Sequence, residues 1–241
     1  MSMRSNNYLN NWHRVWSSRK IQSSLHGTLL EKLIAMDGFD SPLGLMKESE
    51  WRLYTDRLAK IASINLGDSI FEIGCGSGAF LLPFAEKGHD VGGIDYSEEL
   101  IHTARNAMPL FKSDFIIGDA TQCDQDIKVD IVIANHVFHY FSSLHYASDV
   151  LSKMLTKAKF AVAVTGIPDF EFKIQSEQAR QGILTPAEYH KKYDGLDILY
   201  FSRAWFSDFA KLYSFSTSFY NHEMPGFAQN EFRFDCVFRK M

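Results

Sequence analysis

The sequence contains little cysteine and no long hydrophobic run. Cys75, Cys123 and Cys236 are its three cysteines, and their wide spacing fits neither a disulfide framework nor a zinc site. No run approaches the ~18 apolar residues that a transmembrane helix needs. The N-terminal segment is polar and lacks the apolar core of a signal peptide. We therefore expect reduced thiols, no bound metal, no membrane association and a cytoplasmic location.

An excess of charge of one sign is also missing. The net charge is −4, and charged residues make up 22% of the sequence without forming a basic stripe. Proteins that bind nucleic acids usually concentrate lysine and arginine on one surface, so we expect no nucleic-acid partner. The 241 residues, 46% of them hydrophobic, can bury one sizeable core. We expect a single domain over residues 1–241.

Hydrophobic segments of two periods alternate in the middle of the chain. Short apolar runs predict strands, and amphipathic segments beside them predict helices. The predicted strands are residues 69–73, 91–94, 115–117, 130–134 and 160–164. The predicted helices are residues 47–63, 79–87, 98–108 and 143–157. This alternation is typical of an α/β fold in which helices cover both faces of a doubly wound, mostly parallel sheet.

The two ends of the chain and one long connection depart from this pattern. "EFRFDCVF" (residues 231–238) alternates strictly, and "FSTSFY" (residues 215–220) can pair with it, which predicts an antiparallel hairpin. Trp12 and Trp16 have helical spacing, and we interpret residues 1–50 as a helical cap or lid. Residues 168–200 are longer than an ordinary connection, which predicts an insertion near a ligand site.

A glycine-rich turn follows the first predicted strand. In "FEIGCGSG" (residues 71–78), the glycines are Gly74, Gly76 and Gly78. Glycine lets the backbone turn sharply and approach a ligand, and in doubly wound sheets ligands bind where such strands end. With Ala79 the spacing matches the nicotinamide-dinucleotide fingerprint, and by itself it equally matches a loop that binds S-adenosylmethionine. The glycines do not decide between these ligands.

Acidic neighbours favour S-adenosylmethionine. Glu72 lies two residues before Gly74, where its charge would repel a pyrophosphate and attract a cationic amino-acid group. Asp119 follows the third predicted strand, where a carboxylate can accept a hydrogen bond from the exocyclic amine of adenine. The phenylalanine-rich hairpin is also no part of a minimal dinucleotide-binding fold.

Four motifs together resemble those of class I S-adenosylmethionine-dependent methyltransferases, and the resemblance runs from about residue 47 to the end of the sequence. The motifs are "FEIGCGSG", "VGGIDYS", "GDA" and "VDIVIANHVFHYF". The resemblance implies a Rossmann-like α/β fold with seven strands in the order 3-2-1-4-5-7-6, of which strand 7 is antiparallel. It also implies an enzyme of the transferase class with S-adenosylmethionine as its cofactor.

The same resemblance implies roles for individual residues in binding the cofactor. Asp95 would accept hydrogen bonds from both ribose hydroxyls, and Tyr96 would lie beside the adenine. Asp119 would bind the adenine amine, and the backbone N–H of Ala120 would bind a ring nitrogen. The other implied residues surround the methionine and ribose part of the cofactor: Tyr54 at its carboxylate, the carbonyl of Asn135 at its amino group, and Glu72, Gly74, Cys75, Gly76 and Gly78 at the turn.

The exit of the fourth predicted strand bears on the acceptor of the methyl group. "NHVF" (residues 135–138) stands where nucleic-acid and protein amide N-methyltransferases carry Asn/Asp-Pro-Pro-Tyr/Phe. His136 and Val137 replace the two prolines, which favours a small-molecule acceptor methylated on oxygen or nitrogen. His139 is the first candidate for the general base and His136 the second, because a neutral imidazole can take a proton at neutral pH. We expect residues 168–200 to lie beside this acceptor site.

Two other functions fit the same glycine turn. One is a nicotinamide-dependent oxidoreductase on a Rossmann fold. The other is a non-catalytic protein that binds a nucleoside ligand. Titration with NADH and with S-adenosylhomocysteine separates the first from the methyltransferase, and assays of methyl transfer separate the second.

Overall fold

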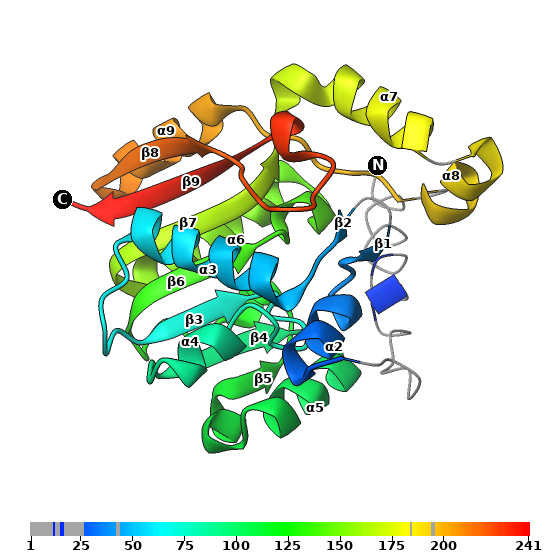
Figure 1. Ribbon diagram of the computed structural model, residues 1–241. Coiled ribbons are helices and arrows are strands. Elements are labelled where there is room, and N and C mark those ends of the chain that lie inside the picture. Colours follow the sequence, from blue (N-terminus) through cyan, green and yellow to red (C-terminus); the bar gives the residue numbers. More distant parts are fainter. Residues whose placement is uncertain (1–11, 13–14, 17–26, 42–43, 184, 194–195) are drawn as a thin grey trace.

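A seven-stranded sheet forms the centre of the molecule (Figure 1). The computed structural model describes residues 12, 15–16, 27–41, 44–183, 185–193 and 196–241. The strand order is β5-β4-β3-β6-β7-β9-β8, and β9 pairs antiparallel with both of its neighbours. Counted from β3, this confirms the predicted order 3-2-1-4-5-7-6. The strands are β3 (Ile70–Ile73), β4 (Val91–Asp95), β5 (Phe115–Ile117), β6 (Val129–Asn135), β7 (Ala158–Pro168), β8 (Phe215–Asn221) and β9 (Arg233–Lys240).

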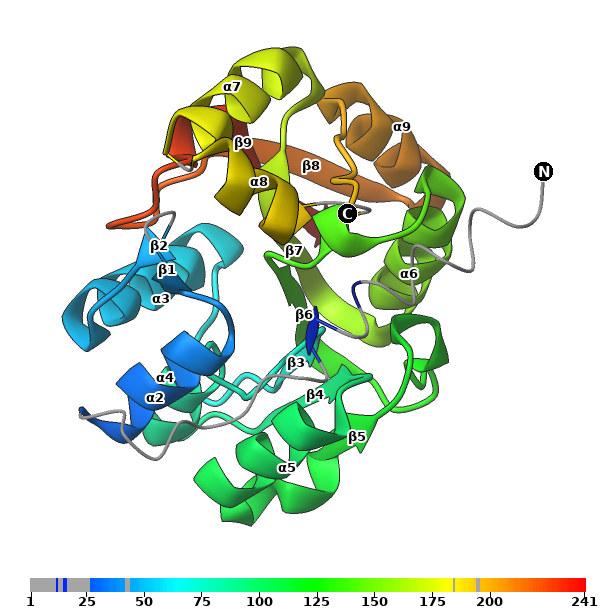
Figure 2. The ribbon, with the colours of Figure 1, turned by 90° about the vertical axis from the view of Figure 1, so that its right-hand side faces the viewer.

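Helices cover both faces of this sheet, as predicted. Figure 2 shows α3 and α4 on one side and α6 and α9 on the other. The α-helices are α2 (Leu29–Met36), α3 (Glu48–Ala62), α4 (Leu82–Glu86), α5 (Glu98–Ala107), α6 (Leu144–Lys157), α7 (Lys173–Ile183), α8 (Pro186–Tyr193) and α9 (Arg203–Tyr213). The 3₁₀-helices are η1 (Pro109–Asp114), η2 (Ala120–Gln122), η3 (Phe138–Tyr140), η4 (Phe170–Phe172) and η5 (Asn230–Phe232).

Each face of the sheet has its own hydrophobic core. Side chains of α2, α3, α4 and α5 fill one core, in which Trp51 and Phe84 are almost completely buried. Side chains of α6 and α9 fill the other, around Met154 and Phe206. Burial of this apolar surface is the main favourable contribution to the free energy of folding.

Local sequence signals explain where several elements begin. The Ser97 side chain accepts a hydrogen bond from the backbone N–H of Leu100, and acidic residues fill the first turn of α5. This cap places the start of α5 where the sequence predicted it. The helix predicted at residues 79–87 is shorter, because the turn that begins at the glycines continues to Leu81 before α4.

The predicted C-terminal hairpin is also present, but β9 lies inside the sheet. It separates β7 from β8, so both of its edges are paired. Phe234 and Phe238 enter one core and Val237 enters the other. Asp235 shares the face of Val237 and is fully buried, which brings a carboxylate into the interior.

The remaining elements gather where the parallel strands end. Figure 1 shows α7, α8 and a two-stranded ribbon, β1 (Asp40–Ser41) with β2 (Gly44–Leu45), at this end of the sheet. Residues 168–200, predicted as an insertion, contain η4, α7 and α8. Among the described helices, none is long and apolar enough to cross a membrane.

Trp51 ties α3 to the glycine turn and supplies a test of this packing. Its indole Nε1 donates a hydrogen bond to the carbonyl of Ala79 at 2.9 Å. Trp51→Phe leaves that buried carbonyl without its donor, so we expect the free energy of unfolding to fall by about 1–3 kcal/mol, measured by urea denaturation followed by circular dichroism. Trp205→Phe, at a half-buried position where the indole N–H has no partner among the described residues, is the control. Equal losses in the two variants would contradict this role.

Candidate cofactor and acceptor site

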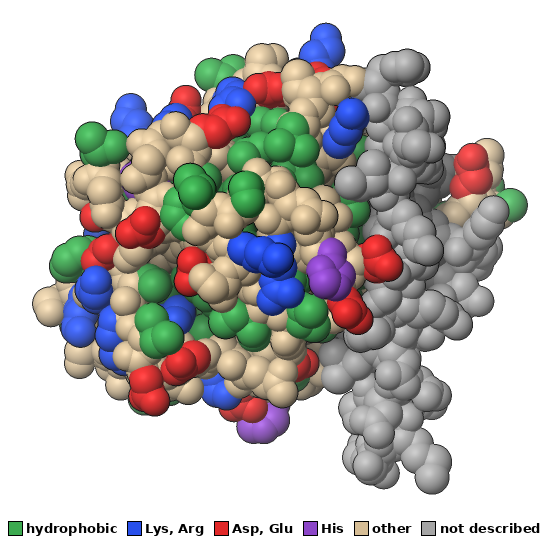
Figure 3. Space-filling view, turned by 90° about the horizontal axis from the view of Figure 1, so that it is seen from below, with side chains coloured by type: hydrophobic (Ala, Val, Ile, Leu, Met, Phe, Trp, Pro, Cys, Tyr) green, Lys and Arg blue, Asp and Glu red, His purple; other side chains and the backbone are tan. Residues whose placement is uncertain are grey.

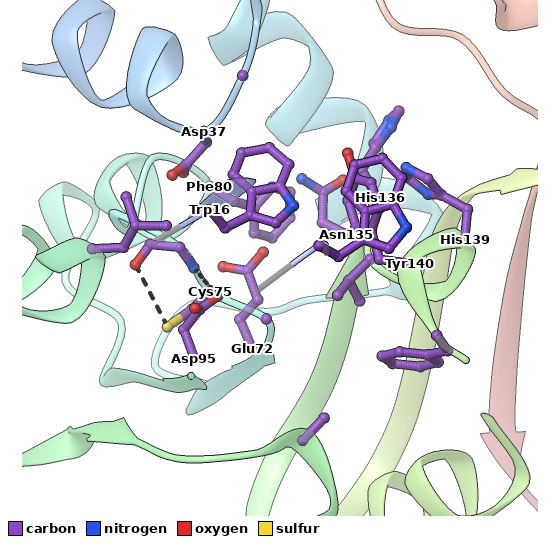
Figure 4. Close-up of a pocket in the computed structure, with 18 of the residues that line it drawn as sticks. Trp16, Asp37, Glu72, Cys75, Phe80, Asp95, Asn135, His136, His139 and Tyr140 are labelled. Atoms are coloured by element: carbon purple, nitrogen blue, oxygen red, sulfur yellow. Dashed lines mark hydrogen bonds between the residues drawn. The ribbon is translucent and has the colours of Figure 1, made fainter. Parts of the chain in front are cut away.

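A cavity of about 260 Å³ lies at the carboxyl ends of β3, β4 and β6 (Figure 4). Nearly all of the predicted site residues line it: Glu72, Gly74, Cys75, Gly76, Asp95, Tyr96, Asp119, Ala120, Asn135, His136 and His139. The fold therefore brings together residues from four separate strand ends. Two predicted residues, Tyr54 and Gly78, lie outside the lining.

The glycine turn forms the floor of the cavity. Gly74 has φ +70° and Gly76 has φ +52°, a region that residues with a side chain seldom adopt. A Cβ atom on Gly74 would lie 2.5 Å from Val137 Cγ2, and one on Gly76 would lie 2.5 Å from Asp37 Oδ1. Both glycines are therefore required by conformation and by close approach of neighbouring segments.

Asp95 connects this turn to the start of α5. Its Oδ2 accepts a hydrogen bond from the backbone N–H of Gly76 at 3.0 Å, and its Oδ1 accepts one from Ser97 at 2.8 Å. A carboxylate has about four acceptor positions, so it can still accept bonds from hydroxyl groups of a ligand. This placement suits the predicted ribose contact.

Asp119 is held from two sides. Its Oδ1 accepts from the backbone N–H of Thr121 at 2.8 Å, and the Tyr146 hydroxyl lies 2.8 Å from both carboxylate oxygens. Tyr146 also lines the cavity. No pattern in the sequence indicates a role for this tyrosine, because it lies on α6 and a tyrosine on an amphipathic helix normally only packs.

Glu72 is a buried carboxylate with an unsatisfied oxygen. It is 2% exposed, and its Oε2 has no hydrogen-bond partner among the described residues. Burial, and then the charges of Asp37 and Asp95, raise the pKa of Glu72 well above its usual value. A cationic group in the cavity would relieve this cost. The glycine floor and this carboxylate therefore fit a ligand with a positively charged amino-acid end.

Asp37 is a residue of this region that the sequence analysis missed. It follows α2, and its Oδ1 accepts a hydrogen bond from the backbone N–H of Ser77 at 2.7 Å. Burial raises the pKa of Asp37 to about 7, although the hydrogen bonds from Ser77 oppose the change. "DG" after an apolar helix indicates a turn, but nothing in the sequence indicates which loop that turn reaches.

The structure corrects the assignments of Tyr54 and Gly78. Tyr54 is fully buried, and its hydroxyl donates to Asn135 Oδ1 at 2.7 Å, so it supports Asn135 instead of facing the cavity. A Cβ atom on Gly78 would lie 2.5 Å from Met108 Cε and 3.3 Å from Ala104 Cβ. Gly78 therefore allows the turn to pack on α5.

The two halves of the cavity differ in chemistry. Carboxylates surround the glycine turn, whereas rings and guanidinium groups surround the half beyond β6. The second set comprises Phe39, His136, His139, Tyr140, Arg180, Phe227 and Arg233. Arg180 and Arg233 are 4% and 9% exposed, so both cations lie inside the protein. The cavity thus has an acidic end and an aromatic, basic end.

Residues from both predicted accessory segments reach the cavity. The rings of Trp12 and Trp16 pack on Tyr140, with centroid distances of 4.4 Å and 5.4 Å. Trp12 Nε1 donates to the carbonyl of Asp197 at 3.3 Å, which joins the N-terminal segment to the insertion. Much of residues 1–50 lies outside the described residues, and their role as a cap or lid stays a prediction.

Part of the chain matches a known protein family. Residues 70–158 match the family described as "Methyltransferase domain". The match begins at β3 and ends at the start of β7, so the matched segment includes the glycine turn, Asp95, Asp119 and both candidate histidines.

Relatives of known sequence are similar to part of the chain. A 23S rRNA (uracil(1939)-C(5))-methyltransferase of Neisseria lactamica is 36% identical over 78 residues, which are 31% of this chain and 17% of that protein. An O-antigen chain terminator bifunctional methyltransferase/kinase of Escherichia coli is 27% identical over 124 residues, or 49% of this chain and 17% of that protein. The chain spans less than half the length of the curated relatives it matches.

Solved structures share the fold over a longer range. Magnesium protoporphyrin IX methyltransferase from Synechocystis PCC 6803, with bound S-adenosylhomocysteine, has a TM-score of 0.62 and 16% sequence identity. The alignment covers 97% of this chain and all of that one. The predicted class I methyltransferase fold is thereby confirmed.

The raised pKa of Asp37 predicts a pH-dependent stability. The unfolded value is 3.8 and the folded value about 7, so the folded protein binds more protons between these values. The contribution of Asp37 to the free energy of unfolding therefore falls as the pH rises through this window. Asp37→Asn lacks this titrating carboxyl group. The free energy of unfolding of the wild type minus that of the variant should therefore fall steadily from pH 4 to 7.

Thermal unfolding of both proteins across pH 4–8 measures this difference. Part of the change arises from Glu72, because the charge of Asp37 also raises its pKa. Asp126→Asn, at an exposed aspartate, is the control. A constant difference between wild type and Asp37→Asn across the window would show that Asp37 is not held protonated.

Proposed function

We propose that this chain is an S-adenosylmethionine-dependent methyltransferase that acts on an oxygen or nitrogen of a small molecule. The observation that carries the proposal is the divided cavity of the methyltransferase domain. Its acidic end has an unsatisfied Glu72 carboxylate above the glycine turn, and its other end is lined by rings and two imidazoles. One half suits a cationic nucleoside cofactor and the other suits an organic acceptor.

The residues that would hold the cofactor follow the strand ends. Asp95 would accept hydrogen bonds from the ribose, and Asp119 from the adenine amine. Glu72 and the carbonyl of Asn135 would face the positively charged amino group. When bound, the cofactor supplies a methyl group on a positive sulfur, and the acceptor lone pair forms the new bond as the methyl–sulfur bond breaks and its electron pair stays on sulfur.

The contribution of the protein is to orient the acceptor, exclude water and take a proton. Alignment of two reacting groups can supply a large part of the rate of such a displacement. Trp12 and Trp16 cover Tyr140 beside the cavity, which limits access of water at that point. His136 and His139 both line the acceptor half of the cavity, and a neutral imidazole there can take the proton of the acceptor.

Two features support a small acceptor rather than a nucleic acid. The acceptor half of the cavity lies beneath Trp12 and the insertion, where a polymer would have little room. Figure 3 shows basic and acidic side chains interspersed on one face of the molecule, without the basic concentration that binds phosphates. The Neisseria relative is named for a methylated uracil in rRNA, but the similarity covers only 31% of this chain and 17% of that protein.

The cofactor is tested by calorimetric titration. We expect binding of S-adenosylhomocysteine and no binding of NADH. Asp95→Asn should weaken the S-adenosylhomocysteine affinity about 10- to 100-fold, because hydrogen bonds to a charged carboxylate contribute about 1.5–3 kcal/mol each. Asp90→Asn is the matched control, since Asp90 is exposed at the opposite end of β4. Tight binding of NADH would support the oxidoreductase instead.

The acceptor class is tested with S-adenosylmethionine labelled in its methyl group. The protein is incubated with a low-molecular-weight metabolite fraction and, separately, with total RNA. We expect label in the metabolite fraction, and none when Asp95→Asn replaces the wild type. Label in RNA would overturn the small-molecule acceptor, and cofactor binding without transfer to either pool would support a non-catalytic binding protein.

A further inference from the structure

Behind the wall of the acceptor half, four polar side chains form a continuous chain of hydrogen bonds. His136 Nε2 lies 3.0 Å from His222 Nε2, and His222 Nδ1 lies 2.7 Å from Asp235 Oδ1. Asp235 Oδ2 accepts a bond from Arg57 Nη1 at 2.8 Å. The side chains of His222 and Asp235 are completely buried, whereas His136 lines the cavity.

The backbone is shaped around this chain. His136 has φ +54°, a strained conformation for a residue with a side chain. A Cβ atom on Gly166 would lie 2.6 Å from three atoms of the His136 ring, so the glycine makes room for the imidazole. The backbone N–H of Gly166 donates to Asp235 Oδ1 at 2.9 Å. An irregularity in the pairing of β7 with β9 places Gly166 there.

The hydrogen bonds fix which ring nitrogens carry protons. Although burial opposes it, His222, Gly166 and Arg57 lower the pKa of Asp235, so its carboxylate is ionised and can only accept. A neutral His222 then carries its proton on Nδ1, which leaves Nε2 as an acceptor. His136 must in turn donate from Nε2. The lone pair of His136 is therefore on Nδ1, which has no hydrogen-bond partner among the described residues.

The lone pair of His139, in contrast, already faces a cation. Its Nδ1 lies 3.4 Å from Arg233 Nη1, and a guanidinium group can only donate. The lone pair of His139 is therefore on Nδ1 and directed at a cation, and its Nε2 carries a hydrogen. This imidazole can donate a hydrogen bond to a ligand but has no lone pair free to accept a proton.

We propose that His136, and not His139, is the general base of the methyl transfer, and that His222 and Asp235 are positioning residues that hold its tautomer. This inference rests on the proposed function. The proton leaves the acceptor oxygen or nitrogen and moves to Nδ1 of His136, and the electron pair of the broken bond stays on the acceptor atom that binds the methyl carbon. The ionised Asp235 stabilises the resulting positive ring through His222.

The groups around His136 keep it neutral before the reaction. Burial, and then His222, Arg233 and His139, lower the pKa of His136 well below its usual value. The other faces of the ring are apolar: Phe39 and Phe227 lie at 5.4 Å and 5.1 Å between centroids. The base is therefore unprotonated at neutral pH, and the charge that forms during proton transfer is balanced by Asp235.

A shared metal ion is the alternative explanation for two facing imidazoles. It would need further ligands, and the described part of the chain contains no group of three side chains able to hold a metal. The Nδ1 of His222 is also bonded to a carboxylate with nothing between them. The chain of hydrogen bonds from His136 through His222 to Asp235 accounts for both contacts of the His222 ring.

The tautomers are measured first, by ¹⁵N NMR of histidine-labelled protein without any ligand. We expect a proton on Nδ1 of His222 and on Nε2 of His136. His89 is an internal reference, since its Nδ1 faces the carbonyl of Asp68 at 3.0 Å and must carry a hydrogen. In Asp235→Asn this order should be lost. A wild-type spectrum with a proton on Nδ1 of His136 overturns the inference and leaves the proposed function standing.

Kinetics with an identified acceptor complete the test. His136→Asn should lower kcat about 10²- to 10⁴-fold with unchanged S-adenosylhomocysteine affinity, because asparagine tolerates the positive φ but is no base. Asp235→Asn, or His222→Gln if that variant does not fold, should lower kcat similarly, with a loss that shrinks at high pH. His139→Asn should retain more activity than either, and His89→Gln is the control for loss of a buried imidazole.

The opposite ranking, with His139→Asn more damaging than His136→Asn, overturns the assignment of the base. Normal kcat in Asp235→Asn with an altered tautomer overturns the positioning role. Failure to bind S-adenosylhomocysteine at all would instead overturn the proposed function, whatever the tautomers are.

Discussion

The structure depends on the close approach of three chain segments to a turn in which Gly74, Gly76 and Gly78 lack side chains. Val137 and Asp37 occupy the space where Cβ atoms on Gly74 and Gly76 would be. Asp95 accepts the N–H of Gly76 from a third direction. These contacts leave no space for a side chain at Gly74 or Gly76, so the floor of the cavity is closely packed where the strand ends meet.

The hydrogen bonds around this floor also explain why charge is unevenly distributed in the cavity. Carboxylates that satisfy backbone N–H groups must lie close to the turn, and Glu72 joins them without a partner of its own. Such a cluster raises the free energy of the empty protein. The same cluster favours a cationic ligand, so binding of that ligand offsets part of the unfavourable free energy of the clustered carboxylates.

The sequence was sufficient to predict the sheet and most residues of the cavity floor. Period and glycine spacing are local properties, and parallel strands necessarily end at the same edge, so Glu72, Asp95 and Asp119 could be placed together. Partners across the fold could not be predicted. The contact between His136 and His222 joins residues 86 positions apart, and no repeat or spacing marks it.

Tyr54 shows the limit of a local pattern. Its helical spacing correctly predicted a residue on the buried face of α3, but spacing says nothing about what a hydroxyl meets inside the protein. The partner proved to be Asn135, 81 positions away, on β6. The order of the two candidate bases was likewise predicted without the groups that face each ring, which a local pattern does not show.

The position of β9 has a consequence for the order of folding during synthesis. β7 and β8 are not adjacent in the sheet, so β8 has no partner until residues 233–240 have emerged from the ribosome and inserted between them. The first strands can associate as soon as they are made. Asp235 therefore arrives with the last strand of this sheet, and a nascent chain holds a nearly complete cofactor floor before it has an organised acceptor wall.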